Sequence, residues 1–244
     1  MRRRRTYLIG ALGLALALAI SSVAISAPAD QTLDVIVGGK AKPKLDKKQF
    51  KKSSIEVTTT VADAANPSGI PPKANRAVLK FSKPNLKFSP RAKPGCEPSQ
   101  VENTTTEAAL AACGNAKVSR RGDATVALPL GPGGSRQDFP AVVTAFNDGS
   151  QKGILLHTRV PDLGTTAVLR GKITGGNTLD VAIPPIGGGA GAVDRFHVLV
   201  KAGKYVQARC KRKTIKTKST FSFNDAPDAT VADSQKCKRK KKRN

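Results

Sequence analysis

The 244-residue chain has no tryptophan, only two histidines, and 4% aromatic residues in total. A core therefore has to be built from Val, Ile, Leu, Ala and Phe, and this mixture, with many Thr and Gly, favours strands over helices. Acidic residues are also few, because 17 Asp and Glu stand against 42 Lys and Arg, which gives a formal net charge of +25. These scarcities predict a strongly basic all-β protein.

Motifs of the common catalytic classes are missing as well. The sequence contains no G-x-S-x-G nucleophile elbow, no H-E-x-x-H helix and no Gly-Lys-Ser/Thr phosphate loop. His157 and His197 both fall in predicted strands without a partner motif, so we interpret them as ordinary strand residues rather than as a general base or a metal ligand. We expect no enzyme, no cofactor and no metal site.

A hydrolase on a β-scaffold, for example one that acts on polysaccharides, is the alternative function. Such an enzyme needs two carboxylates that flank the scissile bond, roughly 5–9.5 Å apart. Asp180 and Asp194 are the candidate pair, although no motif surrounds them. An open cleft with paired acids would favour this alternative, whereas a closed sandwich with basic ends would favour a binding protein.

The first 29 residues have the three-part layout of a secretory signal peptide. Four arginines, Arg2 to Arg5, precede an uncharged apolar run from Leu8 to Ile20, and Ala27-Pro28-Ala29 fits the A-x-A cleavage pattern, with cleavage after Ala24 or Ala27 as rivals. An uncleaved anchor is the alternative, but the apolar run is shorter than the ~20 residues that a membrane span needs. We expect an exported or envelope protein that begins near Asp30. The segment from Arg4 to Leu8 resembles a twin-arginine motif, and we favour the Sec route over this alternative.

Four cysteines follow, at positions 96, 113, 210 and 237. An even number in an exported protein indicates two disulfides, and three connectivities are possible. We predict local pairing, Cys96–Cys113 and Cys210–Cys237. A zinc site requires closely spaced C-x(2–4)-C pairs, which this sequence lacks.

Alternating apolar residues and Gly/Pro turns predict strands along most of the mature chain. We expect strands at 31–37, 55–61, 77–81, 86–89, 124–130, 141–147, 154–160, 166–174, 179–183, 196–201, 205–211, 217–224 and 229–233. A capping box at Thr104–Glu107 and a stop at Gly114 predict one short helix over 105–113. The expected fold is all-β, an antiparallel β-sandwich with one short helix.

The predicted organisation has four parts: a signal peptide (1–29) with an N-terminal signal helix, an N-terminal strand with a Lys-rich arm (30–54), the β-sandwich domain (55–237) and a disordered basic tail (238–244). A division near Ser119 into two smaller β units is the alternative. The tail is expected to be disordered because like charges repel and no apolar residue anchors it.

Several short motifs carry a resemblance to known sequences. They are Pro94-Gly95-Cys96, the segment from Ala112 to Val118, the segment from Pro140 to Asn147, and the cysteine near the end. In these the chain resembles uncharacterised secreted, β-rich, four-cysteine proteins of soil actinobacteria, over about residues 75–237. The resemblance implies secretion and the local disulfide pairing, and it implies no functional site.

Charge is concentrated in runs. Seven lysines lie between Lys40 and Lys52, with Asp46 the only acid, and we expect this run to be a solvated arm. A Cys210–Cys237 disulfide would place two further clusters side by side, and these are the candidate polyanion-binding residues: Arg209, Lys211, Arg212, Lys213, Lys238, Arg239, Lys240, Lys241, Lys242 and Arg243.

The candidate residues lack interleaved aromatics that would stack bases, so a specific nucleic-acid site is not expected. We expect anionic cell-wall polymers, acidic polysaccharides or lipid headgroups as partners, and the sequence identifies no small-molecule substrate. The alternative is that the charge only maintains solubility.

Overall fold

A computed structural model describes residues 29–240, so the predicted signal peptide lies outside the described residues except for Ala29. Strands make up most of the described chain, and the all-β prediction is confirmed. The strands are β1 (Ala29–Val37), β2 (Lys44–Leu45), β3 (Lys51–Asp63), β4 (Ala74–Phe81), β5 (Leu86–Phe88), β6 (Ser119–Leu128), β7 (Gln137–Asn147), β8 (Gly153–Val160), β9 (Thr165–Thr174), β10 (Thr178–Ala182), β11 (Ala192–Ala208), β12 (Thr214–Phe223), β13 (Ala229–Lys236) and β14 (Lys238–Arg239).

Helical structure is short. The one α-helix of the described chain is α1 (Thr106–Cys113), as predicted, and it is joined by six single turns of 3₁₀-helix. These turns are η1 (Pro90–Ala92), η2 (Pro98–Gln100), η3 (Gly114–Ala116), η4 (Pro132–Gly134), η5 (Pro161–Leu163) and η6 (Gly187–Gly189). Within residues 29–240, no helix combines the length and the apolar character that crossing a bilayer requires.

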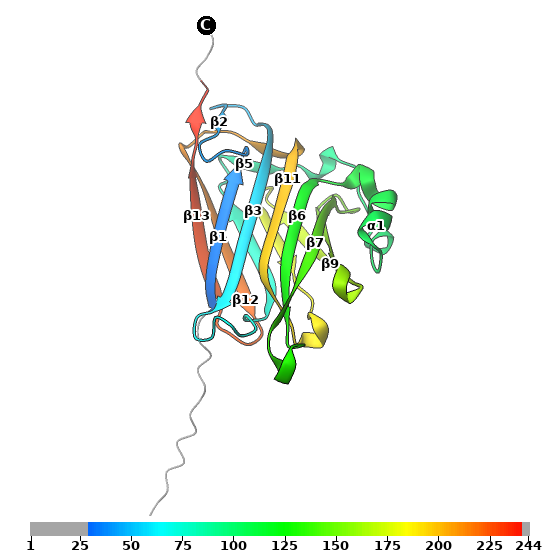
Figure 1. The fold of residues 1–244 in the computed structure, drawn as a ribbon. Coiled ribbons are helices and arrows are strands. Elements are labelled where there is room, and N and C mark those ends of the chain that lie inside the picture. The colour runs from blue at the N-terminus through cyan, green and yellow to red at the C-terminus, as the bar shows by residue number, and fades with distance from the viewer. Residues whose placement is uncertain (1–28, 241–244) are drawn as a thin grey trace, which may run out of the picture.

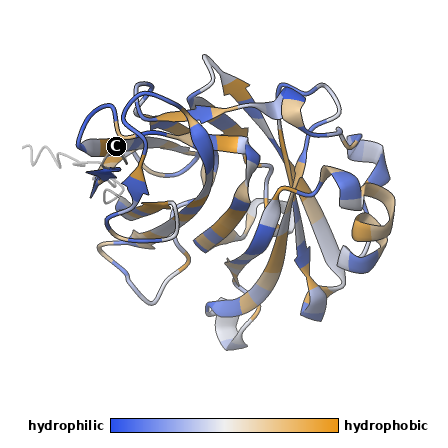
Figure 2. Cartoon of the chain, turned by 90° about the horizontal axis from the view of Figure 1, so that it is seen from above, coloured by the Kyte–Doolittle hydropathy of each residue, from blue (hydrophilic) through white to orange (hydrophobic). Residues whose placement is uncertain are grey.

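Twelve strands form one antiparallel sheet, in the order β1-β3-β11-β6-β7-β8-β9-β10-β4-β12-β13, with β5 paired to β11. The sheet curls back on itself, so its two halves face each other across a shared core (Figures 1 and 2). Because β6 begins at Ser119 and pairs with both β11 and β7, the sheet runs across the alternative division near Ser119. The described chain is therefore not split there.

The two edge strands of the sheet, β1 and β13, lie beside each other along a line that we call the seam (Figure 1). The backbone N–H of Val35 donates to Asp233 Oδ2 at 3.0 Å, and that of Val37 donates to Gln235 Oε1 at 2.9 Å. Gln235 Nε2 donates in return to the carbonyl of Val37. Side chains thus replace a backbone ladder at the seam, and the sheet is nearly closed.

Strand β3 illustrates why this sequence forms the sheet. Ile55, Val57, Thr59 and Val61 are buried and alternate with half-buried residues, as the two-residue period of a strand requires. Their side chains join the main hydrophobic core, to which both halves of the sheet contribute. The curl of the sheet is what turns one face of every strand inward.

Strand β11 differs from the sequence expectation. We predicted separate strands at 196–201 and 205–211, and this division is wrong, because one 17-residue strand runs through Ala202-Gly203-Lys204. The pairing with β3 instead shifts register on either side of Gly203. A glycine between two strand patterns resembles a turn, but bulges can absorb extra residues within a continuous strand.

The ends of α1 also differ in detail. The N-cap is Thr105, whose side chain accepts a hydrogen bond from Ala108 N–H at 3.2 Å, so the predicted capping box begins one residue too early. Thr104 instead donates its hydroxyl to the carbonyl of Val101. The helix ends at Cys113, immediately before Gly114 as predicted, although Gly114 is the C-cap, keeps a right-handed conformation and continues into η3.

The chain stays ordered past Cys237, contrary to the prediction of a disordered tail from Lys238. Strand β14 pairs in parallel with β2, and the N–H groups of Lys238 and Lys240 donate to the carbonyls of Pro43 and Leu45, each at 2.9 Å. The prediction is wrong for residues 238–240, because it weighed charge repulsion without this backbone pairing. Residues 241–244 lie outside the described residues.

Candidate functional site: a basic end held by a disulfide

Both predicted disulfides are present. Cys96–Cys113 has a Cα–Cα distance of 5.6 Å and Cys210–Cys237 one of 6.0 Å, and none of the four cysteines is free. Such bridges are typical of exported proteins. The local connectivity therefore confirms the cysteine prediction and fixes which basic segments become neighbours.

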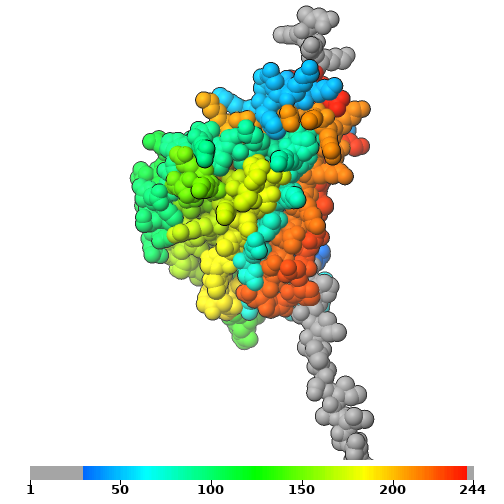
Figure 3. Space-filling view, turned by 180° about the vertical axis from the view of Figure 1, so that it is seen from behind, coloured from blue at the N-terminus to red at the C-terminus, as the bar shows by residue number. Residues whose placement is uncertain are grey.

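Three lysine- and arginine-rich segments meet at one end of the molecule, residues 40–52, 209–213 and 236–240 (Figure 3). Cys210 N–H donates to the carbonyl of Asp46 at 2.6 Å, and Cys237 N–H donates to that of Lys213 at 2.8 Å. We call their cationic side chains the basic end. Its members are Lys40, Lys42, Lys44, Lys47, Lys48, Lys51, Lys52, Arg209, Lys211, Arg212, Lys213, Lys236, Lys238, Arg239 and Lys240.

Seven of the ten candidate polyanion-binding residues lie in this basic end. The other three, Lys241, Lys242 and Arg243, lie outside the described residues. The structure adds the lysines of the 40–52 segment, which the sequence placed in a separate solvated arm. No sequence pattern predicts that the 40–52 segment lies beside the other two. It is held there by the two-residue β2–β14 pairing and by backbone contacts such as Cys210 N–H to Asp46, and pairings this short leave no pattern in the sequence.

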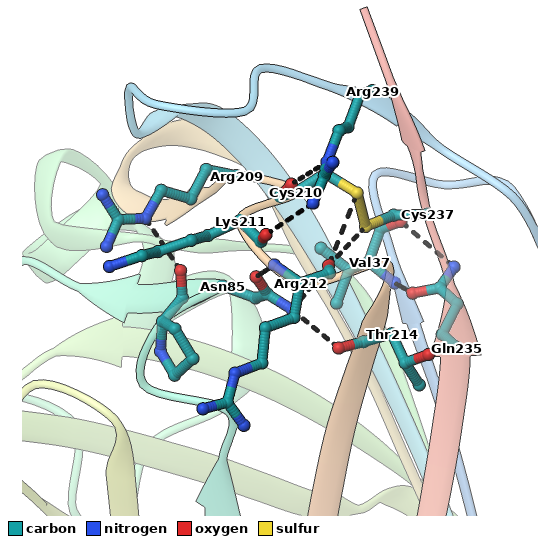
Figure 4. Close-up of a disulfide and its surroundings, with 11 residues drawn as sticks. Val37, Asn85, Arg209, Cys210, Lys211, Arg212, Thr214, Gln235, Cys237 and Arg239 are labelled. Atoms are coloured by element: carbon teal, nitrogen blue, oxygen red, sulfur yellow. Dashed lines mark hydrogen bonds between the residues drawn. A yellow bond between two sulfur atoms is a disulfide. The ribbon is translucent and has the colours of Figure 1, made fainter.

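Two arginines of the basic end donate hydrogen bonds to backbone carbonyls of neighbouring segments (Figure 4). Arg209 donates from Nε to the carbonyl of Pro84 at 2.7 Å, and its guanidinium lies 4.2 Å from the ring centroid of Phe50. Arg239 donates to the carbonyls of Cys210 and Lys211, at 3.3 and 2.9 Å. These hydrogen bonds fix the backbone near Cys210 and Lys211, from which exposed lysine side chains of the basic end extend.

A buried asparagine holds the turn that carries Arg212. Asn85 is fully buried; its Nδ2 donates to the carbonyls of Arg212 and Thr214, and its Oδ1 accepts from Arg212 N–H at 2.9 Å (Figure 4). Sequence reasoning missed this residue, because Asn85 follows Lys83-Pro84 in what reads as an ordinary turn. Its three hydrogen bonds span more than 120 residues of sequence.

The single acid among these segments does not neutralise the lysines. The carboxylate of Asp46 accepts the backbone N–H groups of Lys48 and Gln49, both at 2.7 Å. Hydrogen bonds from Gln49 and then Lys48 lower the pKa of Asp46. Among the described residues every ion pair lies elsewhere in the molecule, and none uses a cation of the basic end.

An open groove of about 650 Å³ continues from the basic end over β4, β10 and β12. We call it the basic groove; its cationic lining residues are Lys80, Lys83, Arg212, Lys216 and Lys218, and none of its lining residues is acidic. Lys216 and Lys218 alternate along one strand, and therefore lie on one face. This two-residue spacing of lysines within a strand pattern is the sequence signal that could have indicated the groove.

Like charges face each other directly across paired strands in this region. Lys218 lies opposite Lys80 in the β12–β4 ladder, and Lys238 lies opposite Lys44 in the β14–β2 pair. Directly opposed like charges destabilise a sheet. The fold accepts this cost at a surface where a bound anion would remove it.

Both histidines make hydrogen bonds that connect elements of the fold. His197 lies on β11 between Asp123 and Glu56, with its ring nitrogens 2.7 and 2.8 Å from their carboxylates. The hydrogen bond from His197 lowers the pKa of Glu56 against the opposing effect of burial. The cluster ties three neighbouring strands together, and no hydroxyl or thiol of the described chain hydrogen-bonds to His197 as a nucleophile would.

His157 on β8 is fully buried, and its Nε2 lies 3.1 Å from the carbonyl of Thr104. Burial lowers the pKa of His157. A neutral ring with a protonated Nε2 satisfies this contact and holds the segment before α1 against the sheet.

Asp180 and Asp194, the candidate hydrolase pair, are not brought together as a pair. Asp180 on β10 is held in a two-pronged ion pair by Arg76, at 2.8 and 2.6 Å, and Asp194 on β11 is held by Arg136 at 2.8 Å. Four strands separate β10 from β11 along the sheet. Arg76 lowers the pKa of Asp180, which opposes a general-acid role.

The described residues contain no cluster of three or more His, Cys, Asp or Glu able to hold a metal ion. No protein-family model and no curated protein matches the chain. Among solved structures it is similar to a DUF4466 family protein from Parabacteroides merdae ATCC 43184, with 10% sequence identity and a TM-score of 0.31. That match covers 85% of this chain and 43% of the other protein.

Proposed function

We propose that this protein is an exported or envelope-associated binding protein that contacts anionic surface polymers through its basic end and basic groove. The observation that carries the proposal is the concentration of unneutralised cations from three separate segments at one end of the fold. The two disulfides and the predicted signal peptide, cleaved near Ala29, support export.

Physical chemistry favours a polymer over a small ligand. The cations are spread along a surface instead of converging on one point, and the groove is open along its length. A polyanion that lies across such a surface releases counterions for each charge it neutralises, so its binding weakens steeply with salt. It also relieves the facing lysine pairs Lys218/Lys80 and Lys238/Lys44.

The test is the salt dependence of binding to three anionic probes, each of a different chemistry: heparin, polyglutamate and vesicles that contain phosphatidylglycerol. The variant K211Q/K213Q removes two exposed lysines beside Cys210. Each cation that contacts the polymer contributes roughly 0.7–0.9 to the slope of log K against log salt concentration, so this variant is expected to lower the slope by about 1.5.

The matched control is K152Q/K172Q, which removes two exposed lysines outside the basic end and the basic groove. It changes the net charge equally and should leave the slope unchanged. Equal losses in both variants would mean that binding reflects net charge alone and would refute a specific role for the basic end, and no binding to any probe would favour the solubility alternative. The ranking of the three probes identifies the class of anion.

A further inference from the structure

An apolar cavity of about 110 Å³ lies inside the curled sheet. Inward-facing side chains of both halves line it, among them Val57, Leu79, Ile154, Leu179 and Val198. The one charged residue in the lining is Asp194, and its carboxylate is engaged by Arg136. The exposed surface inside is almost entirely carbon, so the cavity favours an apolar ligand.

A second cavity of about 250 Å³ adjoins the first. It lies towards the η6 end of the sheet, among residues such as Val126, Leu163 and Ile186. Four residues line both cavities, and they are Leu169, Ile183, Val193 and Phe196. The two cavities therefore adjoin each other across these four apolar side chains, and we call the pair the chamber.

The composition explains why the chamber is left unfilled. The sequence has no tryptophan and eight phenylalanines, and the inward position at the middle of β4 carries only an alanine, Ala77. Protein interiors are normally packed as densely as organic crystals. A cavity of comparable size, about 150 Å³, lined by aliphatic side chains, stays dry and binds benzene.

We propose that this chamber binds one neutral, linear hydrocarbon chain, such as the alkyl chain of a lipid. Apart from Asp194 and the hydroxyl groups of Thr59, Thr158, Thr165 and Thr166, the lining is apolar. It therefore selects against charged groups, because burying them without hydrogen bonds is costly. A flexible alkyl chain can adapt its shape to the two small adjoining spaces. The chamber is separate from the basic end, so this proposal does not depend on the polyanion proposal.

The test uses N-phenyl-1-naphthylamine, a neutral fluorophore that brightens in apolar surroundings, with 1-dodecanol as a neutral competitor. We expect saturable, one-to-one binding to the wild-type protein, displacement by dodecanol and little dependence on salt. Salt-sensitive binding would instead place the probe at the basic end and overturn the proposal. Dodecane and a monoacylglycerol as further competitors distinguish a free hydrocarbon from the chain of a lipid.

Two neighbouring substitutions on β4 localise the binding. Ala77 is buried and lines the cavity, whereas Val78 faces outward. A77F should fill the space and weaken probe binding at least tenfold, and V78F should leave binding unchanged. Equal binding by folded A77F and wild-type protein would refute the chamber as the site.

Because a phenylalanine at position 77 can overfill the core, the wild-type protein supplies a second measurement. A ligand that binds only the folded state raises the melting temperature. We therefore expect dodecanol to raise the melting temperature of the wild-type protein with the same concentration dependence as probe displacement. No shift at saturating dodecanol would overturn the proposal even if A77F does not fold.

Discussion

Replacing Cys210 and Cys237 by alanine removes the covalent link between two segments of the basic end. The bridge spans 27 residue steps, and the chain-entropy relation gives about 3.5 kcal/mol at 25 °C for a loop of that length. A domain of this size loses about 2–4 °C of melting temperature per kcal/mol, so C210A/C237A should melt about 7–14 °C lower than the wild-type protein.

The same substitution should also weaken polyanion binding at a temperature where the variant is still folded. Cys210 and Cys237 are 0% and 6% exposed, and the bridge holds Lys211 and Lys213 beside the β14 segment. Without it, binding has to order these segments, which costs conformational entropy. Thermal melts followed by circular dichroism and heparin titrations at 20 °C measure the two effects separately.

The other disulfide is the matched control. Cys96–Cys113 spans 17 residue steps, for which the same relation gives about 3 kcal/mol, and it packs beside α1 away from the basic end. C96A/C113A should therefore lose similar stability and keep its heparin affinity. If both variants lose affinity equally, or if neither does, the idea that Cys210–Cys237 organises the binding surface is refuted.

Three further predictions concern stability. Deleting residues 238–244 removes the β14 hydrogen bonds and the contacts of Arg239, so it should lower the free energy of unfolding, measured in urea, by about 1–3 kcal/mol. Deleting only residues 241–244 is the control and should leave that free energy unchanged. Identical unfolding curves for the two deletions would rule out a stabilising role for β14. Asn85→Ala leaves the N–H of Arg212 and the carbonyl of Thr214 without their hydrogen-bond partner. It should lower the free energy of unfolding by about 1–3 kcal/mol in the same measurement. No change would show that Asn85 does not stabilise this turn. Burial lowers the pKa of His157, with Arg159 lowering it and Glu107 raising it to lesser extents, so the unfolded chain takes up a proton first as the pH falls below about 6.5. Wild-type stability should therefore decline between pH 7 and 5, and His157→Gln should flatten that decline in melting temperature; parallel curves would contradict the assignment.

Much of the fold could be predicted because strand signals are local. The alternation of Ile55, Val57, Thr59 and Val61 needs no partner strand to be recognised, and the helix at 106–113 begins within one or two residues of the predicted start. The number of cysteines predicted two disulfides, and the local pairing that the structure shows was one of three possible connectivities. The prediction of a break at Gly203 failed, because a glycine between two strand patterns looks the same whether the chain turns or bulges there. The register shifts against β3, which no local pattern records, show that it is a bulge.

The site was predictable only in part. The contact between the 209–213 and 236–240 segments followed from the disulfide, whereas the arrival of the 40–52 lysines depends on a two-residue parallel pairing that leaves no sequence pattern. The basic groove and the apolar chamber depend on how far the sheet curls. Curl is a property of all twelve strands together, so no single segment records it.

The seam between β1 and β13 has a consequence for motion. Everywhere else along the curled sheet, parting two strands breaks a ladder of backbone hydrogen bonds, but at the seam it breaks a few bonds to Asp233 and Gln235. Local opening follows the line with the fewest bonds, so the amides of Val35 and Val37 should exchange with deuterium sooner than those of central strands such as β6. Opening at the seam would expose the core behind it while the other strand pairs keep their backbone hydrogen bonds.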